Sequence, residues 1–533
     1  MQSLSSSSQR FAITAGARAA HMSSSVTPAL WKELSKMEKT MTPVFSLEAA
    51  RDYAQRHDAS VQGGDKAAFH VSSPIGWIND PNGFSVYQGQ IHLFFQHHPY
   101  DAQWGPMHWG HVVTDDLVRW RLLPEALAPD QPYETGCFSG SAVQAGETQA
   151  LIYTSHHDVA QEDGLHRVRQ TQSVAFGNGI NYTKYENNPV ISTRSLPPRA
   201  SKADFRDPKV WEENGVYRMV VGSRSEDHSG QILLYESPDL IHWSFVCVVD
   251  RSHNRLGKMW ECPDFFPLDG RQVLLVSPQE MRPDDQGEFH GKNGTVCIVG
   301  DWDEDAKRFI RRTVGCVDYG WDFYASQTTL LPDGRRVMIA WMQSWDNNVT
   351  PPEQTWTGMM TFPRELRIVN DRLIQLPVKE IEHYYTNRRF VKGVTDSGRR
   401  QLAFGRQLDF TLTVTNAAEA MFNLDVAANE KYSTRITYNA PARRLIIDRT
   451  NAGMVCDHIP VHVVPIREMK DTVKLRVLLD TWSMELFLND GEQAVTTLLY
   501  TPQGAQDVLL RAPKPIHYTF ESHEIDMMED DGK

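Results

Sequence analysis

The feature that most constrains this chain is a regular spacing of short apolar runs. Five such runs follow polar turns, and their first residues fall 60, 65, 57 and 64 residues apart. Repetition at a fixed length indicates an architecture made of stacked copies of one supersecondary unit. A period of about 60 residues suits a four-stranded propeller blade with generous loops. The runs cover residues 91–95, 151–153, 216–221, 273–276 and 337–341.

Five repeats predict an all-β fold with a five-bladed β-propeller over residues 66–370. A shorter echo supports the repeat, because the pattern Asp-Leu-x-x-Trp at 116–120 returns at 239–243. An irregular β-sandwich whose strands happen to be evenly spaced is the alternative that spacing alone leaves open.

The remaining segments are assigned from composition and turn chemistry. A chain of 533 residues exceeds what one core usually holds, so a second domain is expected. Paired β-runs at 433–438 with 444–448, and at 475–479 with 485–488, predict a C-terminal β-sandwich, and Asn489-Asp490-Gly491 is a strong hairpin turn. The predicted segments are a disordered or added leader at 1–25, a helical lead-in at 26–65 with helices at 28–41 and 47–57, the propeller at 66–370, a linker with helical character at 371–392, and the sandwich at 393–533.

Charge and cysteine usage exclude several function classes. A net charge of -13 argues against nucleic acid or an anionic membrane as partner. No apolar run approaches the roughly eighteen residues of a membrane span, and the Ser-rich leader has no secretory apolar region, because Arg18 interrupts its one apolar run. The six cysteines are scattered without a CxxC pair, so a reducing, cytoplasmic location is expected.

Chemistry-bearing residues precede each apolar run. Asp80 lies in the block Trp77 to Gly83, whose Asn-Asp-Pro-Asn-Gly predicts a tight turn at a strand end. One residue in each repeat stands nine to fifteen positions upstream of its run, where an innermost propeller strand would bring it to the axis. These residues are Asp80, Ser139, Asp207, Glu261 and Asp322.

Three of these residues are carboxylates beside Pro or Trp, and that combination suits glycosidic cleavage. The reaction needs a nucleophile, a proton donor of raised pKa, and stabilisation of an oxocarbenium-like centre. A hydrophobic flank of Trp260 and Pro263 is expected to raise the pKa of Glu261, and Arg206 is expected to keep the adjacent Asp207 ionised.

Together these blocks resemble glycoside hydrolase family 32, from about residue 69 to residue 500. The resemblance rests on Asn-Asp-Pro-Asn-Gly at 79–83, Phe-Arg-Asp-Pro at 205–208 and Glu-Cys-Pro-Asp at 261–264. It implies that Asp80 is the nucleophile, Glu261 the general acid/base, and Asp207 a carboxylate that holds the fructosyl hydroxyls. It also implies sugar contacts at Asn79, Gln96, Trp104, Phe138, Ser139, Arg206, Tyr324 and Trp341. The chain departs from the family at His98, where many members carry Asn, and this departure bears on the leaving-group side.

The family implies a retaining hydrolase of terminal non-reducing β-D-fructofuranosides. Sucrose, cleaved to glucose and fructose, is the first expected substrate, beside sucrose 6-phosphate and short fructo-oligosaccharides. Two alternatives stay open: a catalytically silent sugar-binding propeller, and an inverting arabinan or xylan glycosidase, whose carboxyl groups would stand about 6.5 to 9.5 Å apart rather than about 5 to 5.5 Å.

No metal or cofactor is expected. Adjacent histidines such as His97 and His98 project to opposite sides of a strand, which does not favour a shared metal ion. The only expected partner is a small-molecule sugar, and the sequence leaves monomer and homo-oligomer open.

Overall fold

A computed structural model describes residues 45–57, 66–160, 164–347, 349, 355–395, 398–453 and 460–528. Within them the lead-in contains helix α2 (Leu47–His57), as predicted, whose sequence places Glu48 in the first turn and basic residues in the last. The predicted helix at 28–41 and the leader at 1–25 lie outside the described residues. Among the helices described, none is long and apolar enough to cross a membrane.

Five sheets follow one another along the chain. The first runs in the order β19 (Trp356–Thr357), β1 (Gly76–Tyr87), β2 (Gln90–His98), β3 (His108–Thr114) and β4 (Arg121–Leu127). The second contains β5 (Gly136–Ala145), β6 (Thr148–Ala160), β7 (His166–Gly177) and β8 (Tyr182–Lys184). The third contains β9 (Ala200–Glu213), β10 (Val216–Ser225), β11 (Gly230–Ser237) and β12 (Ser244–Arg251). The fourth contains β13 (Met259–Leu268), β14 (Arg271–Gln279), β15 (Val296–Asp303) and β16 (Arg308–Cys316). The fifth contains β17 (Tyr324–Leu330), β18 (Arg336–Trp341), β20 (Arg364–Val369) and β21 (Arg372–Pro377).

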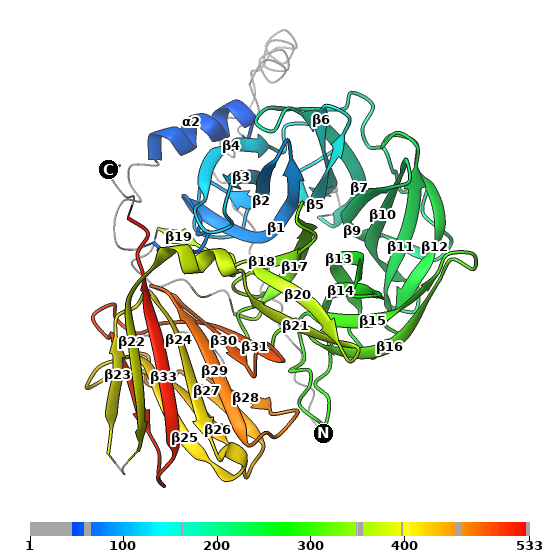
Figure 1. The fold of residues 1–533 in the computed structure, drawn as a ribbon. Helices are drawn as coiled ribbons and strands as arrows, with labels where there is room; N and C mark the ends of the chain where they lie inside the picture. Colours follow the sequence, from blue (N-terminus) through cyan, green and yellow to red (C-terminus); the bar gives the residue numbers. More distant parts are fainter. Residues whose placement is uncertain are drawn as a thin grey trace. The chain divides into compact units, whose positions relative to one another are not determined.

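The first strands of the five sheets form a closed ring. β1, β5, β9, β13 and β17 each pack against the first strands of both neighbouring sheets, and the ring closes from β17 back to β1. Figure 1 shows the sheets arranged around this ring as propeller blades. The predicted five-bladed propeller is therefore confirmed, and each apolar run that revealed the period lies in the second strand of a blade, where burial on both faces demands apolar side chains.

Two six-stranded antiparallel sheets make the predicted C-terminal β-sandwich. One has the order β22 (Tyr385–Val394), β33 (His517–Ile525), β24 (Leu408–Thr415), β29 (Thr472–Leu479), β30 (Ser483–Leu488) and β31 (Gln493–Leu498). The other has the order β23 (Arg400–Phe404), β32 (Asp507–Arg511), β25 (Met421–Ala428), β26 (Thr434–Asn439), β27 (Arg444–Asp448) and β28 (Val461–Pro465). The predicted pairings of β26 with β27 and of β29 with β30 are present.

The segment predicted as a linker, 371–392, mostly consists of paired strands. β21 completes the last propeller blade and β22 begins a sandwich sheet, so the connection shortens to the 3-10 helix η2 (Lys379–Tyr384) and its flanks. The sequence suggested a linker because the exposed edge strand β22 carries few apolar residues. A second short 3-10 helix, η3 (Ala417–Glu419), connects β24 to β25.

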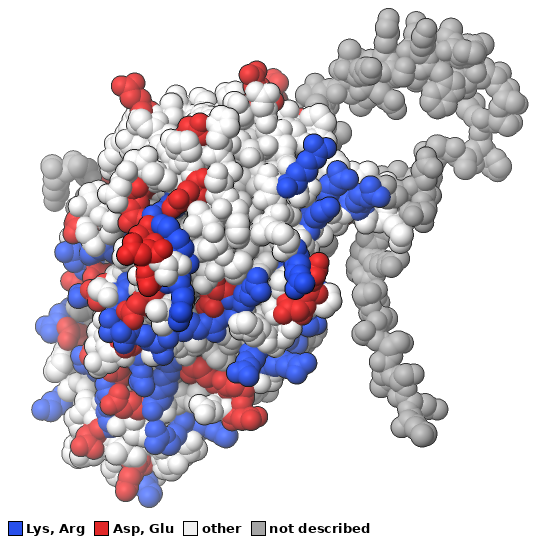
Figure 2. All heavy atoms as spheres, turned by 90° about the vertical axis from the view of Figure 1, so that its right-hand side faces the viewer, with Lys and Arg blue, Asp and Glu red and all other residues white. Residues whose placement is uncertain are grey.

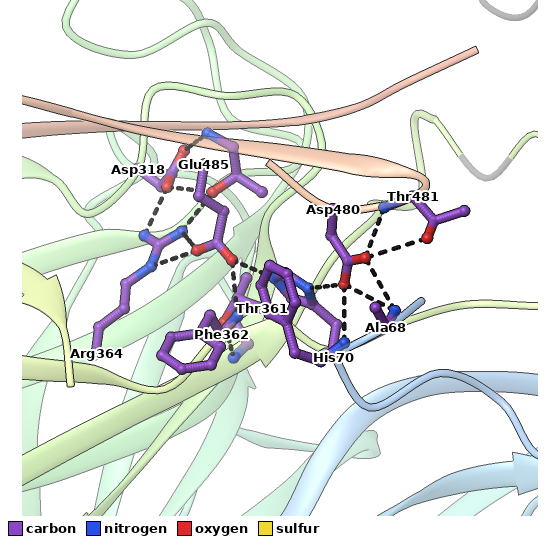
Figure 3. Close-up of polar contacts among 12 residues, drawn as sticks. Ala68, His70, Asp318, Thr361, Phe362, Arg364, Asp480, Thr481 and Glu485 are labelled. Atoms are coloured by element: carbon purple, nitrogen blue, oxygen red, sulfur yellow. Dashed lines mark hydrogen bonds and ion pairs between the residues drawn. The ribbon is translucent and has the colours of Figure 1, made fainter. Parts of the chain in front are cut away.

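A buried ionic network joins the propeller to the sandwich (Figure 3). His70 donates from Nδ1 to Asp480 at 2.7 Å and from Nε2 to Glu485 at 2.8 Å. Arg364 of β20 donates from Nε to the second oxygen of Glu485 at 2.8 Å and from Nη1 to Asp318 at 2.8 Å. Because all five side chains are fully buried, the network joins the two parts through matched charges.

Charged side chains on the outer surface are mixed in sign. On the face in Figure 2, Lys and Arg lie among Asp and Glu rather than in a separate patch. Among the described residues, Arg218 pairs with Glu213, Glu236 and Glu304. This face therefore presents no broad basic surface. The net charge of -13 could not have shown this, because it does not say how the charges are distributed.

Candidate active site

A β-bulge interrupts every first strand at the same level of the propeller. The pairing register shifts by one residue in β1 at Asn79 and Asp80, and in β5 at Ser139. Equivalent shifts occur in β9 at Asp207 and Pro208, in β13 at Cys262 and Pro263, and in β17 at Ala325 and Ser326. A bulge leaves one residue unpaired and redirects its side chain. Five bulges around one axis therefore bring the predicted site residues together.

The predicted turn at Asn-Asp-Pro-Asn-Gly is thus wrong, since residues 79–83 lie inside β1. The same residue chemistry makes bulges instead: Pro is tolerated in a strand where a bulge removes the need for its N–H, and Gly83 has a φ of 53°. Asp207 and Cys262 take positive φ values of 66° and 47° at their own bulges, which is costly for residues with a Cβ.

Asp80 is buried among side-chain donors. Its Oδ1 accepts from Asn79 Nδ2 at 3.0 Å and its Oδ2 accepts from Ser139 Oγ at 2.7 Å. Asn79 is itself held by Trp77, whose indole N–H donates to Asn79 Oδ1 at 2.9 Å. Burial and the negative charge of Glu261 nevertheless raise the pKa of Asp80 above its ordinary value, against these donors, which lower it. Asp80 is thus held by the side chains of Asn79 and Ser139.

Cys262 joins two of the carboxylates. Its Sγ lies 3.4 Å from Asp80 Oδ2 and 3.6 Å from Asp207 Oδ2, and its backbone N–H donates to Asp207 Oδ2 at 3.0 Å. Sequence reasoning missed this cysteine, whose only signal was its place between Glu261 and Pro263. Burial and the nearby carboxylates raise the pKa of the thiol, so it stays protonated and can donate.

Both carboxylate oxygens of Glu261 accept a hydrogen bond. Arg206 Nε donates to Oε1 at 2.8 Å, and the hydroxyl of Tyr324 donates to Oε2 at 2.6 Å. Arg206 and Tyr324, two of the residues predicted to contact the sugar, therefore contact Glu261 directly. A carboxyl group fixed at both oxygens cannot rotate freely, which suits a group that must deliver a proton in one direction.

Arg206 bonds to Glu261 rather than to its neighbour Asp207, which corrects the expected pairing. Successive side chains of a strand point to opposite faces, and the bulge at Asp207 adds to this separation. Three further side chains hold the guanidinium: Gln170, Asp204 and Gln279, each with a contact of 3.2 Å. The charge of Arg206 still lowers the pKa of Asp207, but burial and Glu261 outweigh it and raise that pKa to about 7.

The expected flank of Trp260 is absent from the catalytic face. Its ring is fully buried in the apolar core on the other face of β13, and its indole N–H donates to Leu256 O at 2.7 Å. Asp322 is also displaced from the axis, because it precedes β17 and accepts from Arg449 Nη1 at 2.6 Å in the sandwich. Tyr324, two residues later, reaches the site in its place.

Aromatic side chains wall the site. Trp341 is fully buried and packs edge-on against Trp77 and Tyr324, with ring centroids 5.9 and 6.5 Å away. Phe138 is half-buried, and its ring stacks on that of His156 with centroids 4.0 Å apart. Trp104 packs edge-on against Phe138, with ring centroids 6.2 Å apart. Trp104 is 48% exposed, whereas Asp80, Asp207 and Glu261 are 8%, 5% and 9% exposed. Trp104 therefore lies at the rim and the carboxylates at the base.

Gln96 has a supporting position in this arrangement. Its side-chain amide donates to Cys137 O at 3.0 Å, which ties β2 to β5 beside Phe138 and Ser139. All eleven residues predicted for the site lie on the first two strands of the blades, or, for Trp104, on the loop between β2 and β3.

A layer of buried polar side chains crosses the axis beneath the carboxylates. Gln327 of β17 accepts from Phe84 N at 2.8 Å and donates to Gly140 O at 3.0 Å, which joins three blades. Lys209 of β9 pairs with Asp264 of β13 at 3.3 Å, and both bond the backbone of Thr328. We call Gln327, Lys209 and Asp264 the axial layer.

Within the described residues, no group of three or more His, Cys, Asp or Glu side chains is arranged to hold a metal ion. The five described cysteines are unpaired. What the site brings together is three buried carboxyl groups, one guanidinium, one phenol and a half-exposed aromatic rim. This set can supply a nucleophile, a proton donor and an anionic stabiliser to a sugar.

Comparisons with known proteins point the same way. Residues 70–377 match the model of the glycosyl hydrolases family 32 N-terminal domain, and residues 376–525 match that of the family 32 C-terminal domain. A sucrose-6-phosphate hydrolase of Zymomonas mobilis is 36% identical over 448 residues, covering 80% of this chain and 84% of its own length. A raffinose invertase of Escherichia coli is 35% identical and covers 83% and 91%. The structure of a Bombyx mori family 32 β-fructofuranosidase has a TM-score of 0.78 at 32% identity and covers 92% and 98%.

Proposed function

The chain belongs to glycosyl hydrolase family 32, and from this premise we propose a retaining mechanism for its cleavage of sucrose and related β-D-fructofuranosides. The observation that carries the proposal is the convergence of Asp80, Asp207 and Glu261, which lie at or next to the matched bulges of β1, β9 and β13. A silent sugar-binding protein has no need for a nucleophile and a proton donor in one buried cluster. The relatives likewise give no support to an arabinan or xylan glycosidase.

In the first step Asp80 attacks the anomeric carbon of the fructosyl unit. A bond forms between a carboxylate oxygen of Asp80 and that carbon, the glycosidic bond breaks, and Glu261 protonates the departing oxygen. Ser139 and Asn79 hold Asp80 in one orientation through their 2.7 and 3.0 Å hydrogen bonds. This preorganisation lowers the cost of placing the nucleophile for attack.

In the second step water replaces the leaving group. Glu261, now deprotonated, accepts a proton from that water, whose oxygen attacks the anomeric carbon and releases fructose from Asp80. Two inversions leave the configuration retained. Tyr324 and Arg206 stabilise the carboxylate form of Glu261 during this step, since both donate to it.

We assign two roles to Asp207. It binds the fructosyl hydroxyls, and it stabilises the positive charge that develops on the sugar in the transition state. Its backbone is fixed at a φ of 66°, and its N–H donates to Thr154 Oγ1 at 2.9 Å. Because its pKa is raised to about 7, the cluster retains a proton close to neutral pH. Proton sharing of this kind belongs to the interacting carboxyl groups together rather than to one of them.

We place the working site inside the cell, where transporters deliver sucrose, its 6-phosphate and short fructo-oligosaccharides. The unpaired state of the described cysteines is compatible with a reducing compartment. Cell fractionation with an antibody against the native chain tests this location. Recovery outside the cell would contradict it.

The decisive test of the activity is the product and its configuration. Incubation with sucrose is expected to release glucose and fructose, and proton NMR of the first turnovers should show β-fructofuranose before it mutarotates. Release of the other anomer first would contradict retention. Comparison of kcat/KM for sucrose and sucrose 6-phosphate sets the preferred substrate, and a ratio below about a hundredfold, or about 2.7 kcal/mol, is expected.

A further inference from the structure

The loop that carries Trp104 is held at both ends by a histidine. β2 ends at His98 and β3 begins at His108, and the loop between them presents Trp104 at the rim of the site. His98 donates from Nδ1 to Gln103 O at 2.8 Å, and His108 donates from Nδ1 to Pro106 O at 2.9 Å. These two carbonyls lie on either side of Trp104 and Gly105. The turn that bears the exposed indole is therefore tied from both sides.

The hydrogen bonds fix the protonation of both rings. A carbonyl can only accept, so each Nδ1 must carry the proton. Burial lowers the pKa of His98 below its ordinary value and that of His108 to about 3. Both rings are thus neutral near pH 7, and each acts as a fixed donor rather than as a charge.

The ring of His98 also supports the loop by direct contact. A Cβ added at Gly105 would lie 2.3 Å from Cε1 and 2.5 Å from Nδ1 of His98, so the glycine backbone rests against the imidazole. Tyr100 packs edge-on against His98 at 5.9 Å and against His108 at 5.7 Å. A smaller side chain at position 98 would lose both the hydrogen bond and this packing surface.

We propose that His98 and His108 are positioning residues that act through Trp104 and thereby set the preference of the enzyme for the leaving group. The proposal rests on the retaining mechanism above, in which Asp80 lies beneath the fructosyl unit. The leaving group then projects toward solvent, where Trp104 is half-exposed and the carboxylates are not. A flat indole at that place favours a hexosyl leaving group, whose ring face it can cover.

The test compares two substrates that differ only in the leaving group, sucrose and methyl β-D-fructofuranoside. For His98→Ala we expect kcat/KM on sucrose to fall about fivefold, the scale of one lost hydrogen bond, mainly through a higher KM. On the methyl glycoside we expect less than about a twofold change, because a methyl group does not reach the rim. Equal losses on both substrates, or no loss on either, would overturn the proposal.

Two substitutions separate the hydrogen bond from the packing. His98→Asn keeps a donor at the position of Nδ1 but removes most of the ring, whereas His98→Phe keeps the ring and removes the donor. Each is expected to give a smaller loss on sucrose than His98→Ala. Gly105→Ala should imitate His98→Ala by pushing the ring away, while Gly504→Ala, at a glycine with open space around an added Cβ, serves as its control. A loss from Gly504→Ala equal to that from Gly105→Ala would count against the proposal.

A double-mutant cycle shows whether His98 acts through Trp104. Trp104→Ala is expected to lower kcat/KM on sucrose about tenfold, the scale of a lost aromatic contact, and adding His98→Ala should cost little more. Additive losses would mean that His98 acts independently and would overturn the proposal. If the unaltered enzyme hydrolyses neither substrate, the proposed activity has failed. If it hydrolyses both and His98→Ala matches it, only the histidine inference has failed.

Discussion

Arg206 Nε donates to Glu261 Oε1 across 2.8 Å, so the one guanidinium in the catalytic cluster is bound to the group that must deliver the proton. Three acidic groups and one cation share a small buried space, in which each charge changes the proton affinity of the others. Neutral substitutions there are therefore expected to change pH dependence as well as rate.

Arg206→Met is expected to move the acidic limb of the activity profile to higher pH. The guanidinium lowers the pKa of Asp207, so its removal raises that pKa above about 7. A carboxyl group that holds its proton to higher pH leaves the enzyme inactive over a wider acidic range. We expect a shift of about one pH unit in kcat/KM on sucrose. Arg311→Met, which breaks a peripheral pair with Asp250, is the control, and an equal shift there would refute the explanation.

Asp80→Asn should abolish turnover while the protein remains folded. Asn79 can still donate to the amide oxygen, and the new amide N–H can donate to the hydroxyl oxygen of Ser139, so the local structure is retained, but the nucleophile is lost. A fall on the order of 10⁴-fold or more in kcat is expected. Mass spectrometry of the unaltered enzyme with a slow fructoside should locate the covalent label on Asp80. A label on Asp207 would reverse the two roles.

Glu261→Gln should separate acid from base function. The activity on sucrose is expected to fall by about 10² to 10⁴-fold, because the glucosyl oxygen needs a proton to leave. The activity of the variant on a fructoside with an activated aryl leaving group should fall much less, because that group needs little protonation to leave. Added azide should then replace water at the second step and yield a fructosyl azide of retained configuration. Equal losses on both substrates would indicate that Glu261 only positions other groups.

His70→Gln is expected to destabilise the protein in a pH-dependent way. Asp480 and Glu485 raise the pKa of His70 to about 9 from 6.5, despite the opposing effect of burial. The stabilisation from the imidazolium is therefore complete below about pH 6.5 and is lost as pH rises through about 9. The pKa values of Asp480 and Glu485 are lowered, so their contribution is present above their ordinary values and is lost on acidification.

The loss for His70→Gln should be about 3 to 5 kcal/mol, the cost of leaving buried charge unpaired. Thermal denaturation of both proteins at several pH values measures it. The difference in Tm should be largest near pH 6 and should shrink toward pH 9 and above. The exposed pair of His242 with Asp239 offers a matched control, since His242→Gln removes an ion pair that solvent already screens. A pH-independent difference would contradict the ionic explanation.

The period of the apolar runs was enough to predict the propeller, and the position of each carboxylate upstream of its run was enough to predict that the three lie close together. Strand burial imposes apolar runs, and these repeat with the blades. The alternation of side chains within a strand was the weaker guide, because each bulge shifts it by one residue. Asp322 was chosen from its place upstream of its apolar run, but it precedes β17 and bonds to Arg449, whereas Tyr324 at the start of that strand reaches the site.

Partners across blades could not be predicted from local sequence. Arg206 is adjacent to Asp207 in the chain, yet its bond is to Glu261, 55 residues away. Cys262 touches Asp80 across 182 residues, and only its place between two motif residues hinted at a role. The network around His70 spans more than 400 residues and carries no sequence pattern at all.

The axial layer crosses the propeller axis on one side of the carboxylates, opposite the side on which Trp104 lies. Gln327, Lys209 and Asp264 bridge the first strands beneath the carboxylates, so we expect substrate to enter and product to leave on the side of Trp104. In the proposed mechanism the leaving group departs first, because fructose stays bound to Asp80 until the second step. The vacated passage then admits either water or another sugar to the fructosyl-enzyme. A high concentration of acceptor sugar should therefore divert the fructosyl unit from hydrolysis to transfer. A fructan should be shortened only from its terminal fructosyl unit.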